Sequence, residues 1–166
     1  MLSKKLEAAI NEQIKAEEES SRLYLSMASW CEVHGYAGAA DFLFDHATEE
    51  REHALKFLKF VNDRGGHAKP LALEEPQHDF ESLHQIFEQV LEHEILVTSL
   101  INNLVALSIE EKDYTTHNFL QWYVEEQIEE EASVKDIIDK LKLVGDKNLY
   151  MFDRDIMSMR AADGDE

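Results

Sequence analysis

The chain has 166 residues and a formal net charge of −19, because 35 Asp and Glu residues stand against 16 Lys and Arg residues. A surface of this sign repels nucleic acid, whose binding depends on Lys and Arg at the phosphates, and it attracts cations, although solubility alone also explains it. Cys31 is the only cysteine, which excludes an internal disulfide and a cysteine-rich zinc site.

Glycine and proline are scarce, with 6 and 2 residues, which favours helix throughout the chain. We predict an all-α fold, a four-helix bundle with a short fifth helix at its C-terminal end. The predicted helices cover residues 3–33, 37–64, 82–111, 114–144 and 146–159. Gly35 and Gly145 mark helix ends, and Ser82 with Gln85 fits a capping box. Residues 1–160 then form one domain, and we expect residues 161–166 to be a disordered acidic tail.

The start of the chain and its most apolar stretch both argue against a membrane protein. Residues 1–5 lead into a charged helix and lack the apolar core of a signal peptide. Residues 95–109 are too few to span a bilayer and include Asn102 and Asn103. We therefore expect a cytoplasmic protein with no membrane partner.

The link between the second and third helices differs from the other connections, which are tight turns. It covers residues 66–81, contains Pro70 and Pro76, and shows no periodic pattern. A segment of about 15 residues reaches roughly 50 Å when extended, whereas a helix of about 28 residues is roughly 42 Å long. The link can therefore cross the whole bundle, which predicts that the second and third helices run parallel.

Each long helix has an apolar stripe with alternating spacings of four and three, as expected for packed helices. The stripes begin at Ile10, Ala39, Leu83 and Leu120, and they end at Cys31, Phe60, Leu104 and Leu141. Polar residues interrupt every stripe near its middle, namely Glu17, Tyr24, His46, Glu50, His53, Glu94, Gln127 and Glu130. We expect His46 to be a core histidine.

The interrupting residues are predicted to lie at one height in the bundle. Glu17 and His53 are about equally far from the first helix turn, and Glu94 and Glu130 from the second. One constant offset in residue number also relates the two halves of the chain. It pairs Glu17 with Glu94, Glu50 with Gln127 and His53 with Glu130. The side chains therefore surround one point in the core with pseudo-twofold symmetry.

Four carboxylates at such a point are unfavourable without cations, since buried charges are costly and like charges repel. Two divalent cations would balance Glu17, Glu50, Glu94 and Glu130. Glu50 and His53 lie at i and i+3, so they share a helical face and can bind one metal. Oxygen ligands with a single imidazole suit iron or manganese better than copper or structural zinc. A hydrated polar network explains any one of these residues, but less readily the whole set at matched heights.

With these residues in place, the sequence resembles the bacterial non-haem ferritins over residues 1–160, including the stretch at residues 118–127, Asn-Phe-Leu-Gln-Trp-Tyr-Val-Glu-Glu-Gln. The resemblance implies a ferritin-like di-iron domain that stores iron and oxidises Fe(II) with dioxygen or peroxide. It also implies a homo-oligomeric hollow shell of 24 subunits. The ferroxidase centre of that family has the residue types found here at Glu17, Tyr24, Glu50, His53, Glu94 and Gln127.

The resemblance further implies a third iron position beside the first two. Its residues would be Glu49, Glu126, Glu129 and Glu130, although a solvated acidic face is the alternative. Tyr24 resembles a ferritin tyrosine that hydrogen-bonds or donates an electron near the irons, and a plain core tyrosine is the alternative.

Departures from related families refine this assignment. Bacterioferritins bind haem through a methionine where this chain has Arg51, so we expect no haem. The acidic residues of animal ferritin channels fall at His117 and Leu120, which puts an iron route through that channel in doubt. Trp122 is expected to be a packing residue.

We expect two Fe(II) ions per chain, the first bound by Glu17, Glu50 and His53, and the second by Glu50, Glu94 and Glu130. Gln127 is neutral and should hold metal less tightly than a carboxylate, which suits iron as a substrate. Three alternatives stay open: an oxygenase or peroxidase that keeps its metals, a DNA-protecting mini-ferritin, and a purely structural bundle. The single cysteine excludes the rubredoxin domain of rubrerythrins.

Overall fold

The computed structural model describes residues 1–160, and the predicted acidic tail at 161–166 lies outside this range. All regular secondary structure in the described residues is helical, which confirms the predicted fold class. They are α1 (Lys4–Val33), α2 (Ala37–Asp63), α3 (Leu83–Glu110), α4 (Tyr114–Val144), a 3₁₀ turn (Asp146–Asn148) and α5 (Leu149–Arg160).

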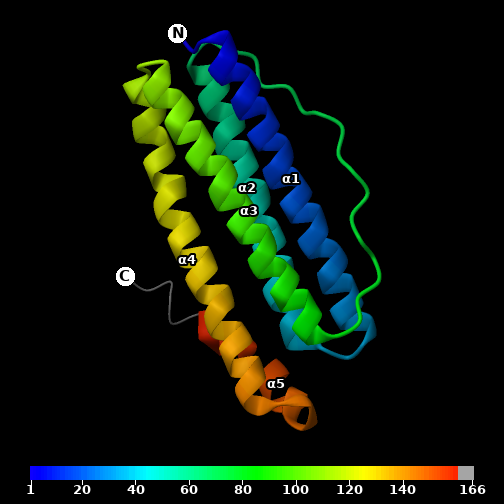
Figure 1. Ribbon diagram of the computed structural model, residues 1–166. Coiled ribbons are helices and arrows are strands. Elements are labelled where there is room, and N and C mark those ends of the chain that lie inside the picture. Colours follow the sequence, from blue (N-terminus) through cyan, green and yellow to red (C-terminus); the bar gives the residue numbers. More distant parts are fainter. Residues whose placement is uncertain (161–166) are drawn as a thin grey trace.

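The chain order of the bundle confirms the predicted crossover. α1 and α2 form one antiparallel hairpin, and α3 and α4 form the other (Figure 1). The link between the hairpins returns along the length of the bundle beside α1, so α2 and α3 run in the same direction (Figure 1). α5 lies at the end of the bundle that holds the α1–α2 turn.

Side-chain caps begin α1 and α3, and the cap of α3 is the one that the sequence predicts. Ser3 Oγ accepts from Leu6 N at 3.2 Å, and Ser82 Oγ accepts from Gln85 N at 3.1 Å. The second half of the predicted capping box is different, because Gln85 Oε1 accepts from Glu81 N at 2.6 Å rather than from the backbone of Ser82. The glutamine thus satisfies the donor one residue earlier, where the link ends.

The crossover link is tied to α1 by hydrogen bonds that local periodicity does not reveal. Asn11 Oδ1 accepts from Lys69 N at 2.7 Å, and Ser26 Oγ donates to Gln77 O at 2.6 Å. Most of the link is exposed or half-buried, but Ala68 and Phe80 are buried at 8% and 7% exposure. The two ends of the link therefore close the two ends of the core.

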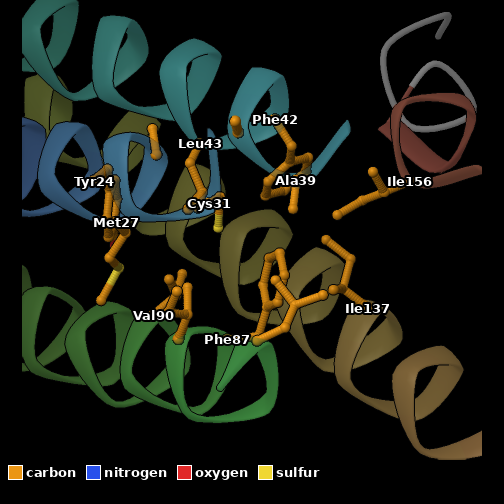
Figure 2. Packing of buried hydrophobic residues seen from close by; sticks show 14 of the residues in the cluster. Tyr24, Met27, Cys31, Ala39, Phe42, Leu43, Phe87, Val90, Ile137 and Ile156 are labelled. Atoms are coloured by element: carbon orange, nitrogen blue, oxygen red, sulfur yellow. The ribbon is translucent and has the colours of Figure 1, made fainter. Parts of the chain in front are cut away.

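The predicted stripes form the core, since their members are buried except Phe60, which is half-buried. The apolar residues divide into two clusters, one at each end of the bundle. Figure 2 shows the cluster near α5, in which Ile156 of α5 lies close to Ile137 and Phe87. The polar residues of the stripes occupy the level between the clusters.

α5 is fixed to the bundle by a cap on α2. Asp153 accepts from Gly38 N at 3.1 Å and from Ala39 N at 2.8 Å, at the helix N-terminus where an anionic side chain is favoured. A Cβ atom on Gly38 would lie 1.8 Å from the carbonyl oxygen of Asp153. The close approach of the two helices therefore requires glycine at position 38.

By length and composition alone, the whole of α3 could cross a membrane. Residues 95–109, its most apolar part, are too few to do so. Its apolar character has another explanation in this fold, because one face of α3 lines the core and presents the buried Glu94 to α1 and α4.

Candidate metal centre

The middle level of the bundle gathers six polar side chains from all four long helices. Each is at most 7% exposed: Glu17 from α1, Glu50 and His53 from α2, Glu94 from α3, and Gln127 and Glu130 from α4. The alternating spacing of the stripes explains the gathering, because each residue takes the place that an apolar residue would have in its stripe. The structure thus brings together the residues that the sequence placed at one height.

Glu17, Glu50 and His53 form a compact group whose ligand atoms all lie within 4.8 Å of one another. Nδ1 of His53 lies 3.7 Å from Oε2 of Glu50, and Gln13 Nε2 donates to Oε1 of Glu17 at 2.9 Å. Oε2 of Glu17 and Oε2 of Glu50 are buried without a hydrogen-bond partner among the described residues. Ionised carboxylates only accept hydrogen bonds, so they cannot satisfy each other, and a cation fits this arrangement.

Burial and mutual repulsion make these carboxylates hard to ionise. Burial raises the pKa of Glu17 well above its usual value, and the charge of Glu50 adds to the effect. Burial likewise raises the pKa of Glu50, with a further contribution from Glu94. The pKa of Glu94 rises to about 7, mainly through burial and then through Glu130. Divalent cations would reverse these effects, since opposite charge favours the ionised form.

Glu94 is held from two sides by donors on other helices. The Tyr24 hydroxyl of α1 donates to Oε1, and the Gln127 amide of α4 donates to Oε2 at 3.1 Å. Burial, followed by the charge of Glu94, raises the pKa of Tyr24 well above its usual value, which keeps the phenol a donor. The contact of Gln127 with the centre is therefore the hydrogen bond from its amide nitrogen to Glu94.

His46, Glu49 and Glu130 form a second compact group with ligand atoms within 4.8 Å. Nε2 of His46 lies 3.0 Å from Oε2 of Glu130, and Nδ1 lies 3.6 Å from Oε2 of Glu49. Burial acts to lower the pKa of His46, but the contact with Glu130 and its charge outweigh burial and raise it. The imidazole also stacks on Phe42 at 4.4 Å between ring centres, so it is both a core residue and part of this group.

The four glutamates expected at the third position are therefore not one compact group. Glu49 and Glu130 lie together, but the third member of their group is His46. Glu126 points instead towards the first group, with Oε1 4.0 Å from Nε2 of His53, and Glu129 is exposed. The sequence does contain a signal for this group, because His46 and Glu49 stand at i and i+3. His46 also fits an apolar stripe, and for that reason it was expected to be a core residue.

Aromatic residues of α4 hold His53 from the outer side. The Trp122 ring lies edge-on to the imidazole at 5.3 Å, and the Tyr123 hydroxyl donates to the His53 carbonyl oxygen at 2.9 Å. Nζ of Lys56 lies 2.9 Å from the centre of the Trp122 ring, a cation–π contact. Trp122 thus contacts both His53 and Lys56, although it is 36% exposed.

The fold and the site together define a four-helix bundle with a carboxylate-rich core, closed by a long crossover. The chain belongs to the ferritin-like family, because the family model of the ferritin-like domain matches residues 7–144.

Relatives extend this match over nearly the whole chain. A probable bacterial non-haem ferritin-like protein of Haemophilus influenzae is 46% identical over 158 residues, covering 94% of this chain and 96% of that protein. A bacterial non-haem ferritin of Campylobacter jejuni is 45% identical over 161 residues, covering 96% of each. The open-pore ferritin of the archaeon Archaeoglobus fulgidus superposes with a TM-score of 0.92 at 45% identity, covering 94% of this chain and 98% of that one.

Proposed function

We propose that the chain is a cytoplasmic iron-storage protein with ferroxidase activity. It oxidises Fe(II) at a centre within each subunit and deposits ferric oxyhydroxide inside a shell of 24 subunits. The observation that supports this most strongly is the pair of buried, unpartnered carboxylate oxygens on Glu17 and Glu50, next to His53. The names of the relatives, which are non-haem ferritins, agree with iron as the metal.

The first Fe(II) binds to Glu17, Glu50 and His53, whose ligand atoms are already close together. The second binds to Glu50, Glu94 and Glu130, with Glu50 as the bridge. Binding releases the protons that burial favours on these carboxylates, because only the ionised groups are ligands. Two carboxylates for each metal balance its charge, which removes the repulsion that adds to burial in raising the pKa of Glu50.

Oxidation then transfers one electron from each iron to dioxygen, which becomes peroxide. The Fe(III) product hydrolyses, releases protons to solvent and leaves for the mineral. Tyr24 and Gln127 keep Glu94 in place by hydrogen bonds from two sides. A neutral amide at position 127 weakens the second position relative to a carboxylate, so that the product can leave.

A third iron position lies beside the second. His46, Glu49 and Glu130 are its nearest set of ligands, and Glu130 is shared with the second position. Glu126 completes the position by side-chain rotation, since it lies one helical turn before Glu130 on the same face of α4, and Glu129 flanks the position from the exposed side. The sharing of Glu130 gives iron a direct path between the second and third positions.

Aerobic iron loading tests the proposal against its alternatives. A store takes up far more than two irons per chain, whereas an enzyme with a fixed di-metal cofactor stops at two. In a structural bundle, replacing both Glu17 and Glu50 by Gln leaves iron binding unchanged, whereas in a store it lowers iron binding. The same preparation, sized by light scattering, tests the 24-subunit shell.

A further inference from the structure

The second metal position is connected to the protein surface by a chain of side-chain hydrogen bonds between α3 and α4. Gln127 Nε2 donates to Oε2 of Glu94 at 3.1 Å and to Oγ1 of Thr98 at 3.3 Å. The Thr98 hydroxyl donates to Oε1 of Glu131 at 2.8 Å. Lys135 Nζ donates to Oε2 of Glu131, also at 2.8 Å. Every bond in this chain has a defined donor and a defined acceptor.

From this geometry we infer that Thr98 and Glu131 are positioning residues that fix the orientation of the Gln127 amide and so prepare Glu94 for the second metal. The inference rests on the proposed metal centre, and it concerns residues outside the set of ligands.

The direction of the bonds is the reason. A glutamine amide has a donor end and an acceptor end, and only the donor end stabilises an ionised Glu94. If the amide were reversed, its oxygen would face the carboxylate, which is repulsive. A threonine hydroxyl bonds to either end of an amide, so Thr98 alone does not decide between the two orientations.

Glu131 decides which way the Thr98 hydroxyl points. An ionised carboxylate only accepts hydrogen bonds, so the single hydroxyl hydrogen of Thr98 is used on Glu131. The Thr98 oxygen can then only accept, and the group that faces it must be the Gln127 nitrogen. Gln127 Nε2 also donates to the main-chain oxygen of Glu94 at 3.2 Å, one helical turn before Thr98. The amide nitrogen thus faces three acceptors, which share its two hydrogens.

The surroundings allow this chain of bonds to be changed without disturbing the core. Gln127, Thr98, Glu131 and Lys135 line one cavity of about 440 Å³ between α3 and α4. Glu131 and Lys135 have side chains that are 21% and 52% exposed. Thr98→Val replaces the hydroxyl by a methyl group of similar size, next to apolar cavity residues that include Ile101.

Anaerobic titration with Zn(II), which binds without oxidation, tests the inference, with site occupancies read from crystals soaked at limiting zinc. Loss of a residue that orients a metal ligand typically costs about 10- to 100-fold in metal affinity. Thr98→Val and Glu131→Ala should each weaken the second position by that factor and leave the position of Glu17, Glu50 and His53 unchanged. Thr98→Ser keeps the hydroxyl, so it should bind zinc nearly as the unaltered protein does. Glu131→Gln should instead weaken the second position, because Lys135 can only donate and would take the amide oxygen, which leaves the amide nitrogen facing Thr98.

Asn102→Ala is the matched control, because Asn102 lines the same cavity but has no part in the chain of hydrogen bonds. Equal zinc affinities in the unaltered protein and in Glu131→Ala, whose change lies near the surface, would overturn the inference even if Thr98→Val failed to fold. A parallel loss at both positions would also overturn it, since that indicates general loosening. Fewer than two zinc ions per chain in the unaltered protein would instead overturn the proposed function and the inference with it.

Discussion

The hydroxyl of Tyr24 on α1 donates a hydrogen bond to Oε1 of Glu94 on α3, across the middle of the bundle. Both side chains are fully buried. The contact joins the two hairpins at the level of the proposed metal centre, so the position of Glu94, the proposed ligand of the second metal, depends on a residue of the opposite hairpin.

Tyr24→Phe should therefore slow iron oxidation without unfolding the chain. The change removes one of the two donors to Glu94 and leaves Gln127 in place. We expect the fast oxidation phase to slow by about tenfold, the lower end for loss of a group that orients a ligand. Stopped-flow absorbance measures the rate, with Tyr36→Phe, outside the centre, as the control. An unchanged rate would assign Tyr24 to packing only.

Glu94 makes the stability of the metal-free protein depend on pH. Its folded pKa is about 7 against an ordinary value of 4.5, so the folded state binds the proton more tightly than the unfolded state. The corresponding stabilisation is complete below pH 4.5 and is lost as pH rises to about 7. For this one group the loss is roughly 3 kcal/mol.

Glu94→Gln removes this titration. Between pH 5 and 7 the metal-free variant should therefore lose less stability than the unaltered protein, as measured by denaturant unfolding at both pH values. Saturating Zn(II) should reduce the pH dependence of the unaltered protein as well, because the metal replaces the proton. Parallel pH profiles of the two metal-free proteins would contradict the raised pKa of Glu94.

Glu49→Ala should empty the third metal position and spare the first. Glu49 and Glu130 lie with His46, whereas Glu129 is exposed. In iron-soaked crystals we expect no metal at the third position of Glu49→Ala, and reduced occupancy in Glu129→Ala or Glu126→Ala. All three variants should change the later steps of oxidation and leave metal at the first two positions. If the unaltered protein has no third metal, these glutamates are a solvated acidic face.

Gln127→Glu should tighten the second metal position, since a carboxylate adds a charge beside Glu94. The unaltered protein should fill its two positions unequally under limiting Fe(II) or Zn(II), with the group of Glu17, Glu50 and His53 first. Anaerobic calorimetry measures both affinities. Two equal, tight positions that the substitution leaves unchanged would favour a fixed-cofactor enzyme over a protein that turns iron over.

The arrangement of the helices and the middle level of the core were predictable from the sequence because both follow from periodicity. A spacing of four and three places Glu17 and Glu94 in the core regardless of which neighbours they meet. The length of the link, together with Pro70 and Pro76, was enough to predict parallel α2 and α3.

Contacts that depend on side-chain direction were not predictable in the same way. Gln85 Oε1 accepts from Glu81 N rather than from Ser82 N, and helical periodicity does not determine which of the two it meets. His46 fits a stripe as a packing residue, and only the distance between α2 and α4 shows that its Nε2 meets Glu130. The part played by Thr98 depends on which way one hydroxyl hydrogen points, and sequence spacing contains no information on that direction.

The oxidation of the first two Fe(II) per chain is the most direct test of the central claim. Stopped-flow absorbance should show a fast phase in the unaltered protein that Glu50→Ala abolishes, because Glu50 is the proposed bridging ligand. The shell should still assemble, since removal of Glu50 also relieves carboxylate repulsion. Glu125→Ala, at an exposed position on α4, should leave the fast phase intact. An undiminished fast phase in an assembled Glu50→Ala shell would contradict oxidation at this centre.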